Sequence, residues 1–167
     1  HGATRVIKGK SMVSEEMHLN HFLEEQGIEA LETDLGEYII QLDGETPSHI
    51  IVPAIHKNKD QIAHLFHKRI PDAPYTGVVE ELNAIARQEL RGKFRAGEVG
   101  ISGVNFAVAE TGTLCLVENE GNGRMCTTAP PVHIALMGLE KVVEKLQDVP
   151  PLLRLLTGSA TGQPITT

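Results

Sequence analysis

The chain has 167 residues, 41% of them hydrophobic, and its 15 basic and 22 acidic side chains give a net charge of −7. A chain of this length can bury roughly 70% of its unfolded surface, so we expect residues 1–167 to form a single domain. The acidic charge argues against nucleic acid or an anionic membrane surface as a partner. Apolar runs such as 50–55 are far shorter than the roughly 18 residues of a membrane span, so none is predicted.

The first half of the chain alternates between strand-like and helix-like segments. The β-branched residues of 4–7 predict a short strand, and Ser14 predicts the start of a helix that runs to about Gln26. The other elements predicted here are strands over 28–33 and 49–55 and helices over 37–42, 58–70 and 78–95. Two prolines mark 70–77 as the expected internal boundary or mobile loop.

The second half of the chain begins with a predicted hairpin. Alternating apolar residues over 104–108 indicate a half-buried strand, 114–117 reads as a buried strand, and Thr111 and Gly112 fit a two-residue turn between them. A buried strand over 132–137 and helices over 139–146 and 152–156 follow. Strand and helix alternation predicts an α/β fold with a mostly parallel sheet sandwiched by helices, and the hairpin would make that sheet mixed.

Two polar segments follow predicted strands and are candidates for a ligand site, although both also fit ordinary solvated turns. The carboxyl ends of strands are where open α/β sheets receive ligands. The residues that we predict to bind a ligand are Lys10, Ser11, Thr111, Gly112, Thr113, Glu118, Asn119, Asn122 and Arg124. Lys10 and Arg124 are expected to border one pocket for a small carboxylate or another anion. The segment 8–11 lacks the first glycine of a phosphate loop.

Catalytic and metal-binding motifs are sparse. Glu110 is the candidate catalytic residue, as a general acid or base at the end of the hairpin. No serine stands in G-x-S-x-G, and no G-x-G-x-x-G fingerprint occurs. The histidine pairs at 18 and 21 and at 64 and 67 have no companion motif, so we predict no metal site. His56 and His133 lie closer to strand ends, where a structural role remains the first interpretation.

The chain has only two cysteines, Cys115 and Cys126, and no C-x-x-C. A four-iron cluster needs four thiolates, so no such cluster and no other cofactor is expected in this chain. Two cysteines fit a reducing compartment, although they do not exclude one disulfide. We interpret Cys115 as buried and Cys126 as a residue of a loop or site wall.

Long segments resemble one known family. The strings A-V-A-E-T-G-T-L-C-L-V-E-N-E-G-N-G-R-M-C-T-T (107–128), K-G-K-S-M-V-S-E-E (8–16), E-T-D-L-G-E-Y-I-I-Q-L (32–42) and P-S-H-I-I-V-P-A-I-H-K (47–57) are similar to the lactate utilization protein B family, in the family's order. The resemblance continues through S-A-T-G-Q at 159–163. It implies a domain with a fold similar to that of sugar-phosphate isomerases and CoA-transferases.

The resemblance also implies a function. Members are cytoplasmic iron–sulfur proteins that act with two partner proteins to oxidise L-lactate to pyruvate, and their 4Fe-4S clusters lie in a cysteine-rich segment that this chain lacks. We therefore expect an excised domain that binds a ligand and docks to partners in lactate oxidation and electron transfer, and that is redox-inactive alone. The alternative is a domain with its own isomerase, transferase or ligase activity on a small carboxylate or phosphorylated substrate, which rests on fold analogy.

Overall fold

The computed structural model describes residues 2–45, 47–48 and 52–163, and the chain divides into two compact units. Unit 1 comprises residues 1–103 and 118–136, and unit 2 comprises residues 104–117 and 137–167. The divisions fall after Gly103, Val117 and Leu136, and not in the proline-containing segment 70–77. The expectation of a single domain stays a prediction.

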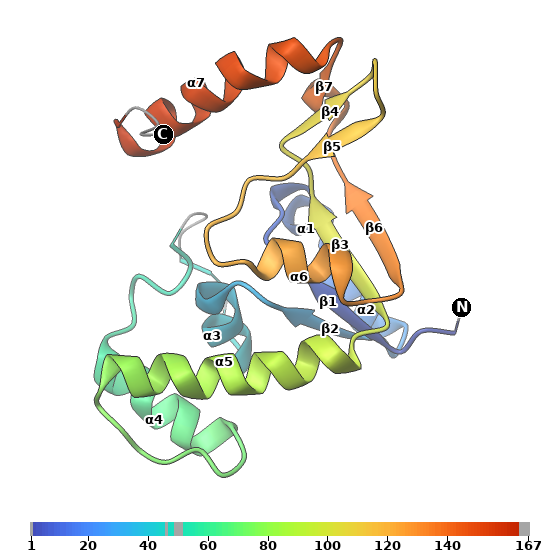
Figure 1. Ribbon diagram of the computed structural model, residues 1–167. Coiled ribbons are helices and arrows are strands. Elements are labelled where there is room, and N and C mark those ends of the chain that lie inside the picture. The colour runs from blue at the N-terminus through green and yellow to red at the C-terminus, as the bar shows by residue number, and fades with distance from the viewer. Residues whose placement is uncertain (1, 46, 49–51, 164–167) are drawn as a thin grey trace. The chain divides into compact units, whose positions relative to one another are not determined.

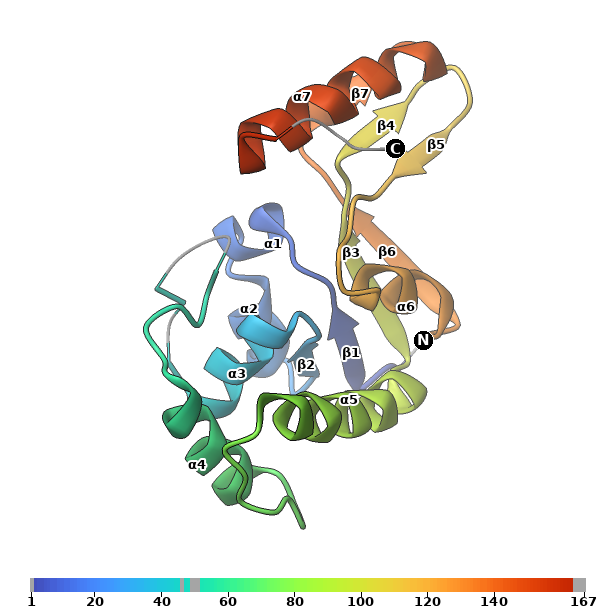
Figure 2. The same ribbon diagram turned by 60° about the vertical axis from the view of Figure 1, so that its left-hand side comes forward.

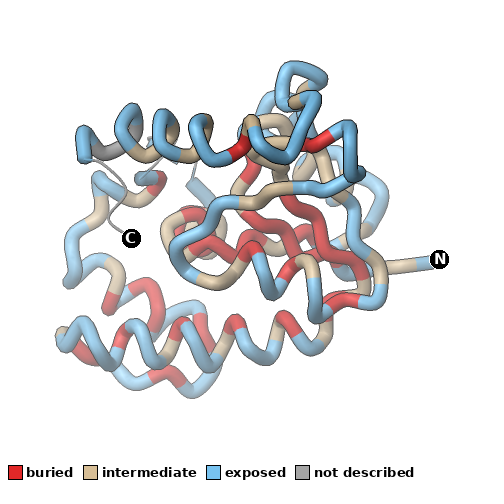
Figure 3. Tube along the Cα trace, turned by 45° about the horizontal axis from the view of Figure 1, so that its top comes forward, coloured by how far each residue is buried: buried red, intermediate tan, exposed pale blue. Residues whose placement is uncertain are grey.

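Unit 1 contains a four-stranded sheet in which every neighbouring pair is parallel (Figure 1). Its spatial order is β2 (Glu29–Glu32), β1 (Arg5–Lys8), β3 (Val99–Gly103) and β6 (Val132–Leu136). The strands β1 and β3 are buried along most of their length, as a central position requires (Figure 3). The edge strand β6 is partly exposed, so the buried strand predicted over 132–137 has the right position and the wrong burial.

Helices cover both faces of this sheet, which confirms the predicted α/β architecture. On one face Leu19 and Leu23, from α2 (Leu19–Glu25), pack against Val6, Val99 and Ile101. On the other face the core is built from Ile7 and from the apolar sides of four helices: α3 (Leu35–Asp43), α4 (Lys59–Arg69), α5 (Val79–Ala96) and α6 (Asn122–Thr128). Helix α4 lies along α5 in both views (Figures 1 and 2).

The helix predicted over 14–26 is broken into two. Ser11, and not Ser14, caps the first helix, α1 (Met12–Glu16), and its hydroxyl accepts a hydrogen bond from the backbone N–H of Ser14. The backbone then turns through His18, whose φ of 52° interrupts helical geometry before α2 begins. Histidine is one of the few residue types other than glycine that adopt a positive φ. The spacing of residues in the sequence does not predict this break in the helix.

The strand predicted over 49–55 is wrong for its described part, because residues 52–56 form turns, and residues 49–51 lie outside the described residues. The helices that follow were predicted correctly. Asn58 and Gln61 form a reciprocal capping box at the start of α4. In α5 the residues Leu82, Ala86 and Leu90 recur at helical spacing and are buried.

Glycine at position 100 lets α6 lie directly on β3. A Cβ at Gly100 would stand 1.8 Å from the backbone oxygen of Cys126, well inside van der Waals contact. On the same side, a Cβ at Gly9 would lie 3.8 Å from the Cα of Gly123. Helix α6 is therefore held against the amino half of β3 through Cys126, while Gly123 lies beside the loop that follows β1.

Unit 2 contains the predicted hairpin in a small sheet of its own. The strands β4 (Phe106–Val108) and β5 (Thr113–Cys115) pair antiparallel, and β7 (Val142–Val143) adds in parallel to β4. Gly112 has the expected positive φ, 68°, but the turn has four residues, 109–112, in place of two. The hairpin is confirmed, whereas its predicted membership of the main sheet and the predicted burial of its second strand are wrong, because β5 is mostly exposed.

The remainder of unit 2 departs from the predicted helix over 139–146. That segment contains the 3₁₀ turns η1 (Leu139–Lys141) and η2 (Leu146–Asp148) on either side of β7. Helix α7 (Val149–Thr161) is longer than the predicted piece, because two prolines occupy its first turn, where a missing N–H costs nothing. Within the residues that the structure describes, no helix is both long and apolar enough to cross a bilayer.

Candidate functional site

The last residue of β1, Lys8, places a fully buried ammonium at the carboxyl edge of the unit 1 sheet. Its Nζ lies 2.8 Å from the Oγ of Ser14, 2.8 Å from Oε1 of Glu15 and 2.8 Å from Oε1 of Glu32. Burial alone would lower the pKa of Lys8, but the charges and hydrogen bonds of Glu32 and Glu15 outweigh it and raise the pKa. The side chain is therefore a permanent cation, because its buried charge is paired.

Glu32 is the partner that the parallel register places beside Lys8. The two residues face each other as the last pair of β1 and β2. Oε1 of Glu32 also accepts a hydrogen bond of 2.6 Å from the amide of Asn20, on α2. Gln41, on α3, holds the strand end by accepting from the N–H of Glu32 and donating to the carbonyl of Ala30. Three elements thus fix the position of this carboxylate.

A third carboxyl group, that of Glu37, reaches the same place from the first turn of α3. Asp34 caps this helix by accepting from the backbone N–H groups of Gly36 and Glu37. Burial, followed by the neighbouring carboxylate of Glu32, raises the pKa of Glu37 to about 9. We call Lys8, Glu15, Glu32 and Glu37 the buried charge cluster, with Asn20 beside it.

Thr33 connects the cluster to α6. Its Oγ1 donates to the carbonyl of Lys8 and lies 3.4 Å from the Sγ of Cys126 and 3.5 Å from the amide nitrogen of Asn122. Cys126 is fully buried and Cys115 is half-buried, so the two cysteine interpretations from the sequence are reversed. Burial raises the pKa of the Cys126 thiol to about 11.

This pKa predicts an inert thiol. In a Cys115→Ser variant at pH 8, Cys126 should react with a disulfide reagent at least about 100-fold more slowly in the folded protein than in urea, because only the thiolate attacks. The folded rate should rise about tenfold for each pH unit up to about pH 11, provided the protein stays folded. Equal rates in buffer and urea would contradict the burial of this side chain.

The predicted ligand-binding residues of unit 1 lie around the loop after β1 and the start of α6. Ser11 is buried as the cap of α1, and Lys10 is half-buried in the same loop. Arg124 is exposed, with its Nε 3.4 Å from Oε1 of Glu118, whose Oε2 accepts from the N–H of Arg124. Asn119 lies in the bend before α6. The proximity of Gly9 to Gly123 brings these two segments together. The strand before α6 is β5 of the smaller sheet, so the two segments do not follow strands of one sheet as expected, and ligand binding by these residues stays a prediction.

Glu120, between these residues, caps another helix. Its Oε2 accepts a hydrogen bond of 3.2 Å from the N–H of Leu35, at the start of α3. Burial raises the pKa of Glu120, and the charge of Lys10 opposes this shift. A carboxylate therefore already occupies the positive end of α3.

The predicted residues of the hairpin belong to unit 2. Glu110 is exposed, and its Oε2 accepts a hydrogen bond of 3.2 Å from the N–H of Leu146, at the start of η2. Thr111 donates to Thr113 across Gly112, with 2.8 Å between the two hydroxyl oxygens. These contacts explain the local sequence structurally, and a catalytic role of Glu110 stays a prediction.

Two serine–histidine contacts occur outside the cluster. Ser48 Oγ lies 2.7 Å from Nδ1 of His56, whose Nε2 lies 2.8 Å from Oε2 of Glu45. Ser48 also donates to the carbonyl of Pro53. Ser48 and His56 are therefore linked across the turn, as expected for a structural contact. The buried Ser102 lies 2.8 Å from Nε2 of His133 on the neighbouring strand. Both histidines thus have structural partners, in agreement with the first interpretation of the sequence.

Sequence reasoning identified the strand that carries the cluster but not its central residues. Lys8 was interpreted as part of a basic turn, and Glu32, Glu37 and Asn20 were not selected. The available signal was a charged residue at the end of each of two predicted strands, because parallel neighbours bring their carboxyl ends together. Without knowing that β1 and β2 pair, that signal could not be read as a contact.

Comparison with known proteins identifies relatives over nearly the whole chain. The LUD domain matches residues 3–167. An uncharacterized electron transport protein, YkgF, from Escherichia coli (strain K12) is 49% identical over 98% of this chain and 34% of its own length. Lactate utilization protein B from Bacillus cereus (strain AH820) and lactate utilization protein B 2 from Bacillus mycoides (strain KBAB4) are each 48% identical, with the same coverage. The chain thus spans about a third of the length of these relatives, and no solved structure matches it.

Proposed function

We propose that this chain, which belongs to the LUD domain family, takes part in lactate utilization as the ligand-binding and docking part of a longer protein. The observation that carries this proposal is the similarity to lactate utilization protein B over 98% of the chain. The longer protein would oxidise L-lactate to pyruvate in the cytoplasm together with two partner proteins. The relatives' names lend no support to isomerase, transferase or ligase chemistry.

The electrons of this reaction require a cofactor outside the 167 residues. Oxidation of lactate to pyruvate removes two electrons, and amino-acid side chains do not carry out such chemistry without a cofactor. Two cysteines cannot hold a four-iron cluster by themselves. We therefore assign electron transfer to 4Fe-4S clusters in the remainder of the longer protein and ligand binding to this domain.

The proposed ligand is a small carboxylate held at the edge of the unit 1 sheet. Lys10 comes from the loop after β1 and Arg124 from the first turn of α6, and the Gly9–Gly123 approach brings the two segments together. Arg124 would exchange its pairing with Glu118 for the two oxygens of the ligand, since a guanidinium matches a carboxylate in geometry. The ion pair is exposed at Arg124, so this exchange costs little.

Calorimetric titration of the chain with L-lactate, pyruvate and D-lactate tests this site. Arg124→Gln should weaken the binding of pyruvate or lactate at least about tenfold, which corresponds to the loss of one charge-assisted contact. Arg95→Gln, a change at another exposed arginine at the end of α5, is the matched control and should have no effect. Equal affinity in wild type and Arg124→Gln would place the ligand elsewhere.

The assignment of electron transfer to another segment predicts that the purified 167-residue chain is colourless. It should reduce no dye in the presence of L-lactate. An absorption spectrum between 350 and 600 nm (about the range of iron–sulfur and flavin bands) and a dye-reduction assay check this. The longer protein is the positive control and should show both the band and the activity. A visible band together with lactate-dependent dye reduction by the 167-residue chain would contradict the assignment.

A further inference from the structure

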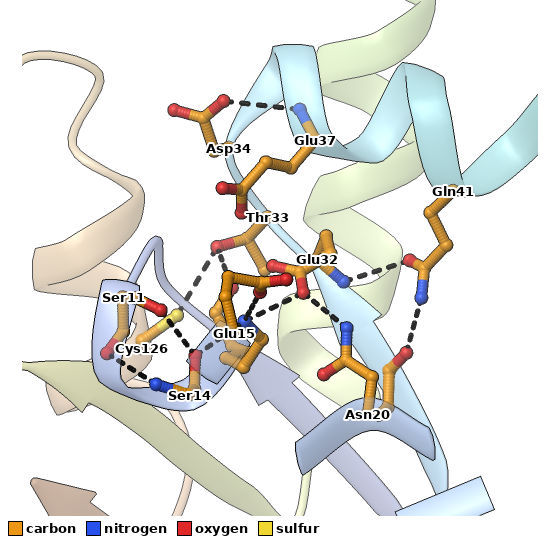
Figure 4. A network of polar contacts seen from close by, with 12 residues as sticks. Ser11, Ser14, Glu15, Asn20, Glu32, Thr33, Asp34, Glu37, Gln41 and Cys126 are labelled. Carbon is orange, nitrogen blue, oxygen red and sulfur yellow. Dashed lines mark hydrogen bonds and ion pairs between the residues drawn. The ribbon is translucent and has the colours of Figure 1, made fainter. Parts of the chain in front are cut away.

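We propose that the buried charge cluster of unit 1 is a binding site for one divalent cation, held by Glu15, Glu32 and Glu37. The three residues come from α1, the end of β2 and α3. Figure 4 shows the carboxyl groups gathered above the end of β1. The site is distinct from the proposed carboxylate site around Lys10 and Arg124, and the proposal does not depend on the role in lactate utilization.

The spacing of the carboxylates suits one ion. One oxygen from each of Glu15, Glu32 and Glu37 can be chosen so that all three lie within 4.8 Å of one another. Oxygen ligands bind Ca²⁺ at about 2.4 Å, so two ligands on opposite sides of the ion lie about 4.8 Å apart and adjacent ligands lie closer. A single cation can therefore contact all three side chains with little movement.

Three buried oxygens of the cluster lack a hydrogen-bond partner among the described residues: Oε2 of Glu32, Oε2 of Glu37 and Oδ1 of Asn20. Glu32 is 4% exposed and Glu37 is 8% exposed, so solvent does not satisfy these atoms. Lys8 and the amide of Asn20 bond to Oε1 of Glu32 and leave its second oxygen without an ammonium or amide donor. The carboxyl of Glu37 can donate to Glu32 when it is protonated, and a bound cation would take the place of that proton. Unsatisfied buried acceptors are rare in proteins, and here all three belong to groups that ligate cations.

The charge of the cluster has the matching value. Three carboxylates and one ammonium sum to −2 when all are ionised, and of these four groups Glu15 alone is partly exposed. Uncompensated buried charge is strongly unfavourable. One divalent cation brings the sum to zero, whereas a proton on Glu37 balances the buried groups alone and leaves the charge of Glu15 to the solvent.

The ligand atoms define the class of cation, and the pocket beside them offers a way in. All three protein ligands are carboxylate oxygens, which favours Mg²⁺, Mn²⁺ or Ca²⁺ over the softer metals that prefer nitrogen and sulfur. The Glu15 side chain is 47% exposed and, with Ser14 and Asn20, lines a pocket of about 500 Å³. An ion can thus enter from this pocket, with water completing its coordination on that side.

The test is a titration of the metal-free 167-residue chain with MnCl₂, followed by the loss of the free Mn²⁺ signal in electron paramagnetic resonance. We expect one ion per chain, displaced by Mg²⁺ or Ca²⁺. Glu15→Gln and Glu37→Gln should each weaken binding at least about tenfold, since even residues outside the coordination sphere cost 10- to 100-fold. Glu16→Gln changes an exposed neighbour on α1 outside the cluster and should leave binding unchanged.

Glu15 is partly exposed, so its glutamine variant remains informative even if Glu37→Gln folds poorly. Circular dichroism establishes the folding of each variant. Absence of saturable binding by wild type would overturn the proposal and leave protons to neutralise the cluster. Binding that Glu15→Gln and Glu16→Gln weaken equally, or that neither weakens, would show an ion held by general surface charge and would also overturn it.

Discussion

Replacing Lys8 with methionine is expected to lower the free energy of unfolding by about 3–5 kcal/mol, the usual cost of removing one partner from a buried ion pair. The ammonium is fully buried and contacts Glu15 and Glu32 at 2.8 Å. Methionine fills a similar volume, so the loss reports the uncompensated carboxylates and not a cavity. Urea unfolding monitored by circular dichroism measures the difference at neutral pH.

The matched control is Lys68→Met, a change at an exposed lysine on α4. Surface substitutions usually change stability by less than about 0.5 kcal/mol, so the control should unfold close to wild type. A second comparison is the double variant Lys8→Met with Glu32→Leu. Because this double variant removes both charges, it should recover part of the lost stability. A loss below 1 kcal/mol in Lys8→Met alone (roughly the value of an exposed pair) would refute the described burial.

Gly100→Ala is expected to destabilise the protein by about 3 kcal/mol or more, at or above the usual range for overpacked sites. The added Cβ would lie 1.8 Å from the backbone oxygen of Cys126, so either β3 or α6 must move. Backbone cannot rotate away as a flexible side chain can. The displacement would disturb the place where Thr33, Cys126 and Asn122 meet, so pyruvate or lactate binding should weaken together with stability.

Gly92→Ala provides the opposite control within the same unit. Gly92 lies in the interior of α5, and a Cβ there would meet nothing within 4 Å. Alanine should stabilise the helix by about 0.5–1 kcal/mol, because glycine has the greater backbone entropy when unfolded. Chemical unfolding of both variants should therefore give shifts of opposite sign. Similar stability of Gly100→Ala and wild type would mean that α6 does not rest on β3.

Local signals in the sequence predicted the elements that depend on local contacts. The Asn58 capping box and the spacing of Leu82, Ala86 and Leu90 are complete within α4 and α5, so no tertiary information was needed. The turn at Gly112 is likewise local. The predicted α/β class followed from this alternation of elements, and the parallel sheet confirms it.

The incorrect predictions concern properties that neighbouring residues do not determine. The apolar residues of 52–55 fit a strand as well as the turns that they form. The break at His18 depends on how α2 packs against Val99 and Ile101, far along the chain. Lys8 and Glu32 are 24 positions apart in the sequence, and their contact depends on the register in which β1 and β2 pair. Tertiary pairing, and not residue type, assembled the cluster.

The interrupted course of unit 1 has a consequence for constructing shorter proteins. Its chain leaves after Gly103 and returns at Glu118, so cutting at the first division would discard α6 and β6 and open one side of the sheet. The two ends of the intervening segment, residues 104–117, are bonded to each other. The N–H of Asn105 donates to the carbonyl of Cys115 at 2.9 Å, and the N–H of Val117 donates to the side chain of Asn105 at 2.8 Å. A short glycine-rich linker can therefore replace residues 104–117. A chain that ends at Leu136 with this replacement would contain every residue of the buried charge cluster.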